Sequence, residues 1–388
     1  MPVQDSSSIE PINTVPASSI QHEWDAAHRS AAKPQVWDYA YVINKQTIGC
    51  TREHLSKVVV SRGSEITLVW TPESSEPVLP EQVPFLLEAL RRNQLKEARN
   101  YVLIGVALVA AGVLLALGAH QWSFVYRNLF SVVGAFMVIE GIWRYASCRN
   151  YTQEDAASDA GAARFASWVK KKKISGYTFT LAACIVVVGV FQGSAGSIEA
   201  AGLVKPAVRN GEIWRLFTAT LMHGSLMHFW FNFLALLHFA KIIEQRMLPG
   251  YVPLVFLLTG PLGSVFSVLL YPNSTSVGAS GGLMGLLGLI TMAAHFDRPK
   301  YPPKYVRQLI QGIVFVGVFG LVGFAFIDNA AHFGGLAGGL LLGWFLFRKN
   351  GQWAKTHKRF LKFAGAAALL GLGVIAAIAV YYILFYPR

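Results

Sequence analysis

Charged side chains are scarce in this sequence, and their scarcity excludes an ordinary soluble protein. Lys, Arg, Asp and Glu make up 14% of the 388 residues, and hydrophobic residues make up 53%. A soluble protein usually carries about 25% charged residues. Because the apolar residues also gather in long runs, the composition predicts a mainly α-helical, polytopic membrane protein that sits in a lipid bilayer.

Acidic residues are the scarcer of the two charged kinds. The chain has 21 Asp and Glu against 34 Lys and Arg, which gives a formal net charge of +13. The basic residues are scattered among the segments between apolar runs, as in the cytoplasmic loops of membrane proteins. This scatter argues against a nucleic acid partner, so we expect none.

Cysteines and metal-site motifs are also rare. Cys50, Cys148 and Cys184 show no paired spacing, so neither a disulfide framework nor a cysteine metal site is predicted. A zinc protease needs HExxH on a helix. HGSLMH (223–228) lacks the Glu, and HEWDAAH (22–28) has the wrong spacing. We therefore predict no metal site.

The start of the chain lacks the features of a secretory signal. Residues 1–35 are polar, and no basic segment there precedes an apolar core. This tail has few aromatic or branched residues, so it is predicted to be disordered. The lack of a signal or transit peptide favours a bacterial inner membrane over a mitochondrion as the expected location.

Residues 36–99 are expected to form a small soluble cytoplasmic α+β domain. Two runs, KVVVS (57–61) and EITLVWT (65–71), are β-like. The second run alternates apolar and polar residues, as a half-buried strand does. The segment that follows, PEQVPFLLEALRRNQL (80–95), predicts a helix.

Nine apolar segments follow, each close to the roughly 20 residues that a membrane-crossing helix needs. The first two form an extra hairpin within 100–146, and a basic cytoplasmic linker spans 147–176. Residues 349–388 hold a basic loop and an extra C-terminal span. Placing the basic loops inside puts the N-terminus in the cytoplasm and the C-terminus outside. The predicted spans are 101–119, 125–145, 177–194, 225–245, 251–271, 280–296, 307–327, 330–348 and 361–385.

Three polar clusters interrupt these apolar segments, and polar groups at membrane depth are costly enough to suggest a function. The first cluster, LMHGSLMHFWFN (221–232), is expected to place His223, His228 and Asn232 along one helix, and the last two are four residues apart and share a face. The second places Ser280 at the start of a span, and the third places His332 near the start of another. Both of these spans enter from the outside, so Ser280 and His332 are predicted to lie at similar depth.

Small residues follow both Ser280 and His332. Gly281 and Gly285, like Gly335 and Gly339, form rows that let two helices approach closely. Such an approach would bring the serine hydroxyl within reach of the imidazole.

A hydroxyl beside an imidazole is the arrangement of a nucleophile and its general base. The developing oxyanion also needs preorganised donors. The Asn232 amide, the His228 ring N–H and the backbone N–H of Ser280 are the candidates. Asp328, four residues before His332, is either an orienting group or an N-cap.

Taken together, these motifs resemble those of the rhomboid family of intramembrane serine proteases. The matching segments are GEIWR (211–215), HGSLMHFWFN (223–232), GASG (278–281) and AHFGG (331–335). Their order and spacing fit a six-helix rhomboid core over residues 177–348.

The resemblance implies a role for each matching residue. It implies that Ser280 is the nucleophile and His332 its base, and that His228 and Asn232 help to form the oxyanion hole. His223 matches a histidine of mainly structural role, and the pair Trp214 and Arg215 is structural in the family. The family implies cleavage of transmembrane segments of other membrane proteins without any cofactor. At Met284 this chain departs from the many members that carry an aromatic residue four positions after the serine.

Two other functions are compatible with parts of this pattern. A catalytically silent rhomboid-like protein would bind client transmembrane segments, but it would be expected to lack the serine or the histidine. A transporter could move protons through the buried histidines, but it would be expected to carry more acidic residues within its spans. The sequence favours an intramembrane serine endopeptidase over both.

Overall fold

The structure is a computed structural model. It describes residues 38–386 except 44–45, 63–64, 75–76, 119–128, 194–195, 323–326 and 349–354. The predicted disordered tail, residues 1–35, lies outside the described residues. The chain divides between Ala166 and Ser167 into two compact units, called here the N-terminal unit and the C-terminal unit.

The N-terminal unit begins with a small antiparallel sheet in the strand order β2-β1-β3. Its strands are β1 (Tyr39–Ile43), β2 (Gln46–Cys50) and β3 (Ile66–Trp70), and helix α1 (Arg52–Arg62) connects the last two. Strand β3 confirms the strand predicted within residues 65–71. The first two strands lie in a stretch for which the sequence analysis predicts no strand.

The prediction of a strand at residues 57–61 was wrong, because these residues belong to α1. A run of valines favours a strand by local propensity. Leu55 and Val59, however, are four residues apart on one helix face, and both are fully buried in a core that includes Tyr41 and Val69. Tertiary packing therefore overrides the local preference.

Two long helices follow the sheet. Helix α2 (Leu87–Gly118) joins the helix predicted at 80–95 to the first predicted span, and α3 (Leu129–Ser147) packs against it. A Cβ on Gly105 would lie 2.6 Å from the Gly134 carbonyl oxygen, so the two helices meet backbone to backbone. This contact supports the predicted hairpin.

The connection between hairpin and core holds a helix that the sequence analysis did not predict. Helix α4 (Gln153–Lys170) lies within the segment 147–176. At its start, the Asp155 carboxylate accepts from the Thr152 N–H at 3.0 Å, and the Thr152 hydroxyl accepts from the Asp155 N–H at 3.2 Å. This reciprocal pair is a capping box that fixes where the helix begins.

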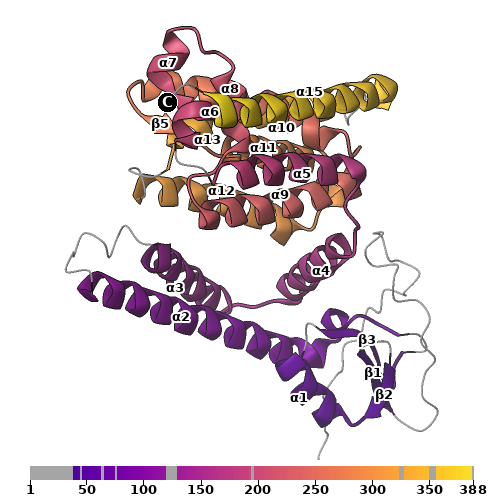
Figure 1. The fold of residues 1–388 in the computed structure, drawn as a ribbon. Coiled ribbons are helices and arrows are strands. Elements are labelled where there is room, and N and C mark those ends of the chain that lie inside the picture. Colours follow the sequence, from indigo (N-terminus) through magenta and orange to yellow (C-terminus); the bar gives the residue numbers. More distant parts are fainter. Residues whose placement is uncertain are drawn as a thin grey trace, which may run out of the picture. The chain divides into compact units, whose positions relative to one another are not determined.

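The C-terminal unit is a bundle of helices with short elements at one end (Figure 1). Helices α10, α11 and α13 contact one another, and α15 packs against α5 and α10. Two short strands, β4 (Leu203–Val204) and β5 (Thr275–Ser276), pair antiparallel. The helices are α5 (Gly176–Phe191), α6 (Ser197–Ala201), α7 (Lys205–Arg209), α8 (Arg215–Thr218), α9 (Leu226–Arg246), α10 (Tyr251–Leu270), α11 (Ser280–Phe296), α12 (Pro303–Val322), α13 (Asn329–Phe347) and α15 (Lys358–Phe385).

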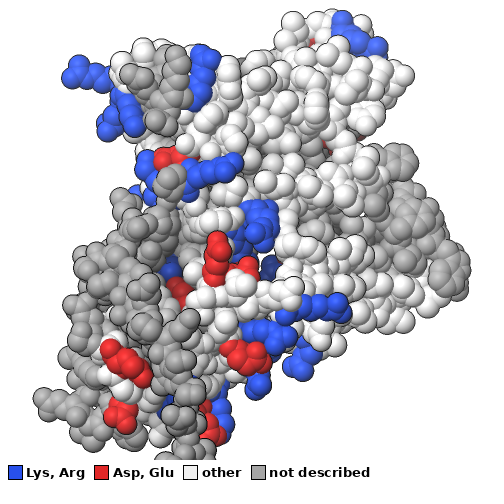
Figure 2. Space-filling model, turned by 180° about the vertical axis from the view of Figure 1, so that it is seen from behind, with Lys and Arg blue, Asp and Glu red and all other residues white. Residues whose placement is uncertain are grey.

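Each of the nine predicted spans falls on one of these helices or on α2 or α3. Among the described residues, five helical segments are both long and apolar enough to cross a membrane: Pro84–Gly118, Leu226–Arg246, Tyr251–Leu270, Asn329–Phe347 and Lys358–Phe385. Helices α5 and α11 are apolar but shorter. On the face shown in Figure 2, wide uncharged areas separate clusters of charged side chains. The chain is thus a polytopic helical membrane protein.

Candidate active site

Helices α11 and α13 touch along their glycine faces, close to the two predicted reacting residues. A Cβ on Gly335 would overlap the Gly281 carbonyl, and the next glycine pair along the helices repeats this overlap. A Cβ on Gly281 would lie 3.5 Å from the Ala331 carbonyl oxygen. The residue after Ser280 therefore contacts the residue before His332. The predicted glycine rows do let the two helices meet at backbone distance.

Ser280 is the first residue of α11. The first N–H groups of a helix have no intrahelical acceptor, and the positive end of the helix dipole lies there. The Ser280 N–H is therefore placed to donate to an anion that forms near its own hydroxyl.

Gly278 leaves a small space open beside the Ser280 hydroxyl. Its φ of +147° lies in a region that residues with a Cβ rarely adopt, and its N–H donates to the Ala219 carbonyl at 3.0 Å. A Cβ at this position would lie 3.0 Å from His228 Nε2 and 3.6 Å from Ser280 Oγ. The imidazole and the hydroxyl therefore face the same space, which the missing side chain keeps free.

The first turn of α9 orients His228. The Ser225 hydroxyl caps the helix by accepting from the His228 N–H at 3.1 Å. The Gly224 N–H points to His228 Nδ1 at 3.4 Å, so Nδ1 is the accepting nitrogen. A neutral imidazole then carries its proton on the other nitrogen. His228 Nε2–H is thus a donor that faces the space beside Ser280.

Asn232 lies one turn further along α9 and is buried. Its amide nitrogen donates to the His228 carbonyl at 3.0 Å, which fixes the side chain. An amide has two N–H donors, so one remains for another acceptor. Asn232 and His228 therefore present donors from one face of α9.

The structure does not link Ser280 and His332 by a direct hydrogen bond between their side chains within the described part of the chain. His332 Nδ1 is buried there without a hydrogen-bond partner. Catalytic hydrogen bonds are often long until substrate binds. Met284, which replaces the aromatic residue of many rhomboids, is buried in α11 one turn after Ser280.

Asp328 serves as the N-cap of α13. Its Oδ1 accepts from the Ala331 N–H at 3.0 Å, and its backbone carbonyl accepts from the His332 N–H at 3.1 Å. The sequence left open whether Asp328 is a group that orients His332 or an N-cap, and in the structure it is an N-cap. The carboxylate also faces Lys205, a buried residue that the sequence analysis did not single out. Lys205 belongs to no periodic pattern or motif in the sequence, so its role could not be predicted.

The loop before α9, which holds Trp214 and Arg215, is stabilised by buried polar contacts. Arg215 is 1% exposed, bonds Glu212 at 2.6 Å, and donates to the carbonyls of Glu199 and Gly202 at 2.9 Å each. Trp214 stacks on Tyr382 of α15 with 3.8 Å between ring centroids. The predicted structural role of the Trp–Arg pair agrees with these contacts.

His223 lies between this loop and α9. Its backbone N–H donates to Gln192 Oε1 at 2.8 Å, and its ring packs edge-on against His228 with 5.2 Å between centroids. Burial, together with the neighbouring His228, lowers the pKa of His223 to about 3. The ring is therefore neutral at physiological pH and supports His228 by packing. Across the described ranges, no three His, Cys, Asp or Glu side chains are placed to hold a metal ion.

Comparison with known proteins identifies the C-terminal unit. The family model described as Rhomboid domain matches residues 210–349. RHOMBOID-like protein 4 of Arabidopsis thaliana is 32% identical over 183 residues, which is 45% of this chain and 46% of the relative. Rhomboid protease GluP of Bacillus subtilis (strain 168) is 35% identical over 136 residues, 34% of this chain and 26% of the relative.

A further relative carries a different functional name. Inactive RHOMBOID-like protein 8 of Arabidopsis thaliana is 33% identical over 145 residues, which is 37% of this chain and 41% of the relative. The chain thus spans less than half the length of these three relatives. The matched region contains α9, α10, α11 and α13 with Ser280, His332, His228 and Asn232. Residues 210–349 of the chain therefore match the rhomboid domain.

Proposed function

We propose that this protein is an intramembrane serine endopeptidase that cleaves transmembrane segments of other membrane proteins. The observation that carries the proposal is the backbone contact of α11 with α13 at Gly281 and Ala331. It supports the proposal because Ser280 directly precedes Gly281 and His332 directly follows Ala331, near the N-terminal ends of the two helices. The Nε2 of His228 faces the Ser280 hydroxyl across Gly278.

The proposed reaction is acyl transfer through the serine. The His332 imidazole accepts the Ser280 hydroxyl proton as Oγ attacks the scissile carbonyl carbon. The carbonyl oxygen becomes an oxyanion that accepts hydrogen bonds from Asn232, His228 Nε2–H and the Ser280 N–H. The imidazolium then gives its proton to the leaving amine. Water, activated by the same imidazole, hydrolyses the acyl-enzyme and restores Ser280.

The space beside Gly278 suits the substrate backbone. A peptide carbonyl must reach Ser280 Oγ and the donors of α9 together, and a side chain at position 278 would fill that volume. A transmembrane helix must also unwind locally to expose a carbonyl. Substrates with small residues that weaken the helix at the cleavage point are therefore expected to be preferred.

The second candidate function is the binding of client transmembrane segments without cleavage. The similarity to Inactive RHOMBOID-like protein 8 and the Met at position 284 favour it. The retained Ser280 and His332 and the donors on α9 argue for cleavage, because binding alone requires none of them.

The proposed orientation places the N-terminus in the cytoplasm and the start of α11 and α13 near the outer surface. The basic segments between spans support it. The expected bacterial inner membrane gains no support from the relatives, which come from a plant as well as from a bacterium.

Cleavage can be tested with purified full-length protein in liposomes and a substrate whose transmembrane segment is rich in small residues. Wild type should release two fragments, and Ser280→Ala and His332→Ala should release none. Ser147→Ala, an exposed serine on α3, serves as the matched control and should cleave like wild type. Cleavage by both active-site variants would show that the proposed pair is wrong. Co-purification of uncleaved substrate with the wild-type protein would favour the binding function instead.

A further inference from the structure

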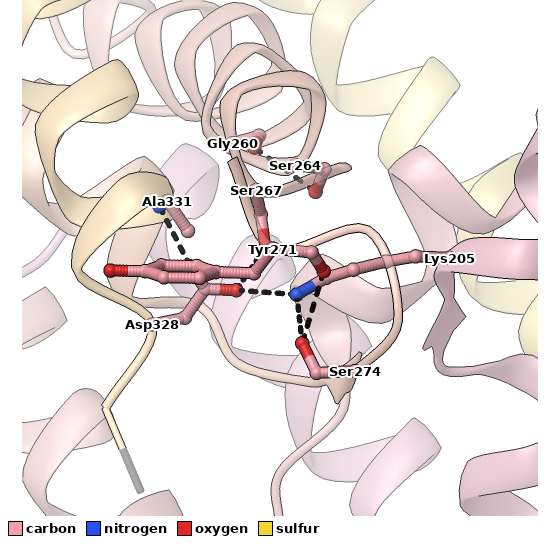
Figure 3. Close-up of polar contacts among 8 residues, drawn as sticks. All are labelled: Lys205, Gly260, Ser264, Ser267, Tyr271, Ser274, Asp328 and Ala331. Carbon is pink, nitrogen blue, oxygen red and sulfur yellow. Dashed lines mark hydrogen bonds and ion pairs between the residues drawn. The ribbon is translucent and has the colours of Figure 1, made fainter. Parts of the chain in front are cut away.

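A cluster of charged and hydroxyl groups around the fully buried Lys205 joins the start of α7 to the start of α13 (Figure 3). Lys205, the first residue of α7, is fully buried. Its Nζ lies 3.6 Å from Asp328 Oδ2 and 2.6 Å from Ser274 Oγ. It also lies 5.6 Å from the centre of the Tyr271 ring. A buried ammonium is costly unless it is paired, so this lysine depends on Asp328.

Asp328 contacts three separate elements through its side chain. Oδ1 accepts the Ala331 N–H and caps α13, while Oδ2 accepts the hydroxyl of Ser267 on α10 and faces Lys205 of α7. The carboxylate therefore ties the first turn of α13 to α7 and to α10 at one point. His332 lies in that first turn, with its N–H bonded to the Asp328 carbonyl.

The imidazole of His332 has no side chain that orients it directly in the described residues. Its Nδ1, which in a triad would donate to a carboxylate, is buried without a hydrogen-bond partner. The direction of the ring must then come from the position of the backbone that carries it. That position is set by the contact with α11 on one side and by Asp328 at the start of the helix.

We propose that Lys205 and Asp328 are positioning residues for the general base, because their ion pair holds the first turn of α13 and thereby aims His332 at Ser280. This inference rests on the proposed protease function. In a catalytic triad, a carboxylate orients the histidine through a direct hydrogen bond. Here the ion pair would orient His332 indirectly, through the helix backbone, from a residue one helical turn away. Neither residue is expected to touch the substrate.

The charge states at neutral pH fit this role. Burial lowers the pKa of Lys205, and Asp328 opposes that change. Burial raises the pKa of Asp328. The hydrogen bonds from Ser267, Ser276 and the Ala331 N–H, together with Lys205, outweigh burial and hold that pKa below its ordinary value. The carboxylate is therefore ionised. Removal of Asp328 leaves the fully buried Lys205 ammonium without its partner, and removal of Lys205 leaves the 16% exposed Asp328 carboxylate without its partner.

Three variants distinguish the effect of the ion pair from the effect of the N-cap. Asp328→Asn keeps an N-cap of similar strength but removes the negative charge. Lys205→Met keeps the apolar stem and removes the positive charge. The double variant removes both charges at once, which is far less damaging than removing one partner. Lys300→Met breaks an exposed pair with Asp297 between α11 and α12 and serves as the matched control.

The readout is covalent labelling of Ser280 by a fluorophosphonate at increasing probe concentrations, in full-length protein that is folded at the assay temperature. Each single variant should lower the maximal labelling rate on the order of 10- to 100-fold, the effect of misplacing a reacting group by about 1 Å. The probe concentration at half-maximal rate should change little. The double variant should recover most of the loss, and Lys300→Met should match wild type.

A structural role alone would lower the thermal midpoint of the single variants without changing the maximal rate of the folded protein, and that result would overturn the inference. Equal loss in the double variant would also overturn it. A wild-type protein that is not labelled at all would instead show that the proposed function is wrong. The two failures are therefore distinguishable.

Discussion

Replacement of Gly335 by Ala is expected to damage both the packing and the chemistry of the site. The added Cβ would overlap the Gly281 carbonyl of α11, and a backbone atom cannot rotate away as a side chain can. The two helices would have to separate by about 1 Å or more to restore ordinary contact. Overpacking of this kind costs about 1–3 kcal/mol of stability.

The effect on catalysis should exceed the effect on folding. Ser280 and His332 lie at the end of this contact, and about 1 Å of misplacement between reacting groups can cost roughly 100-fold in rate. That loss corresponds to about 2.7 kcal/mol in the activation barrier. The assay is cleavage of a reconstituted transmembrane substrate by folded Gly335→Ala protein, together with its thermal unfolding midpoint.

Gly317→Ala on α12 is the matched control, because a Cβ there would meet nothing within 4 Å. Ala favours a helix over Gly by about 1 kcal/mol, so this variant should keep wild-type activity and be no less stable. Wild-type cleavage by Gly335→Ala would refute the view that close approach of α11 and α13 aligns the reacting pair.

Three further changes test other parts of the site. Gly278→Ala would place a Cβ 2.8 Å from His228 Cε1 at a φ of +147°, so substrate cleavage should fall on the order of 100-fold, and unchanged cleavage would show that the space is not used. Asn232→Ala removes one proposed oxyanion donor and should lower kcat by about 100- to 1,000-fold with little change in KM, whereas a change in KM alone would point to substrate binding. The Asp328 carboxylate has a folded-state pKa below its unfolded value, so it stabilises the fold above about pH 4 and loses this contribution as the pH falls through the folded-state pKa. The difference in thermal midpoint between wild type and Asp328→Asn should therefore shrink in acid, and a constant difference would contradict the ion-pair role.

The membrane helices and the proposed active-site residues could be predicted from the sequence, because each depends on a pattern within a short segment. Apolar length alone marks a span, and the Gly281 and Gly335 rows mark a close helix contact without knowledge of the fold. His228 and Asn232 could be placed on one face because helical spacing is regular.

Other features depend on contacts between distant parts of the chain. The valines at 57–61 form a helix because Leu55 and Val59 pack on a sheet whose first strands the sequence analysis did not recognise. The pairing of Lys205 with Asp328 joins residues more than 120 positions apart. Neither hydropathy nor spacing encodes such a contact, because it exists only once α7 and α13 have been brought together.

The orientation of His228 also required the structure. The Ser225 hydroxyl accepts from the His228 N–H, and the Gly224 N–H donates to the His228 ring, so residues within one turn orient the ring. The motif HGSLMH was visible in the sequence. The sequence did not show which ring nitrogen of His228 accepts a hydrogen bond. Met284 is buried where many rhomboids carry an aromatic residue, and no contact of its side chain explains the difference.

Mass spectrometric mapping of a fluorophosphonate adduct on the purified wild-type protein shows directly whether Ser280 is the nucleophile. We expect a single modified serine, Ser280, and no adduct in His332→Ala, since an unactivated serine hydroxyl reacts poorly. Labelling of wild type at another serine, or equal labelling of Ser280 in His332→Ala, would contradict this expectation.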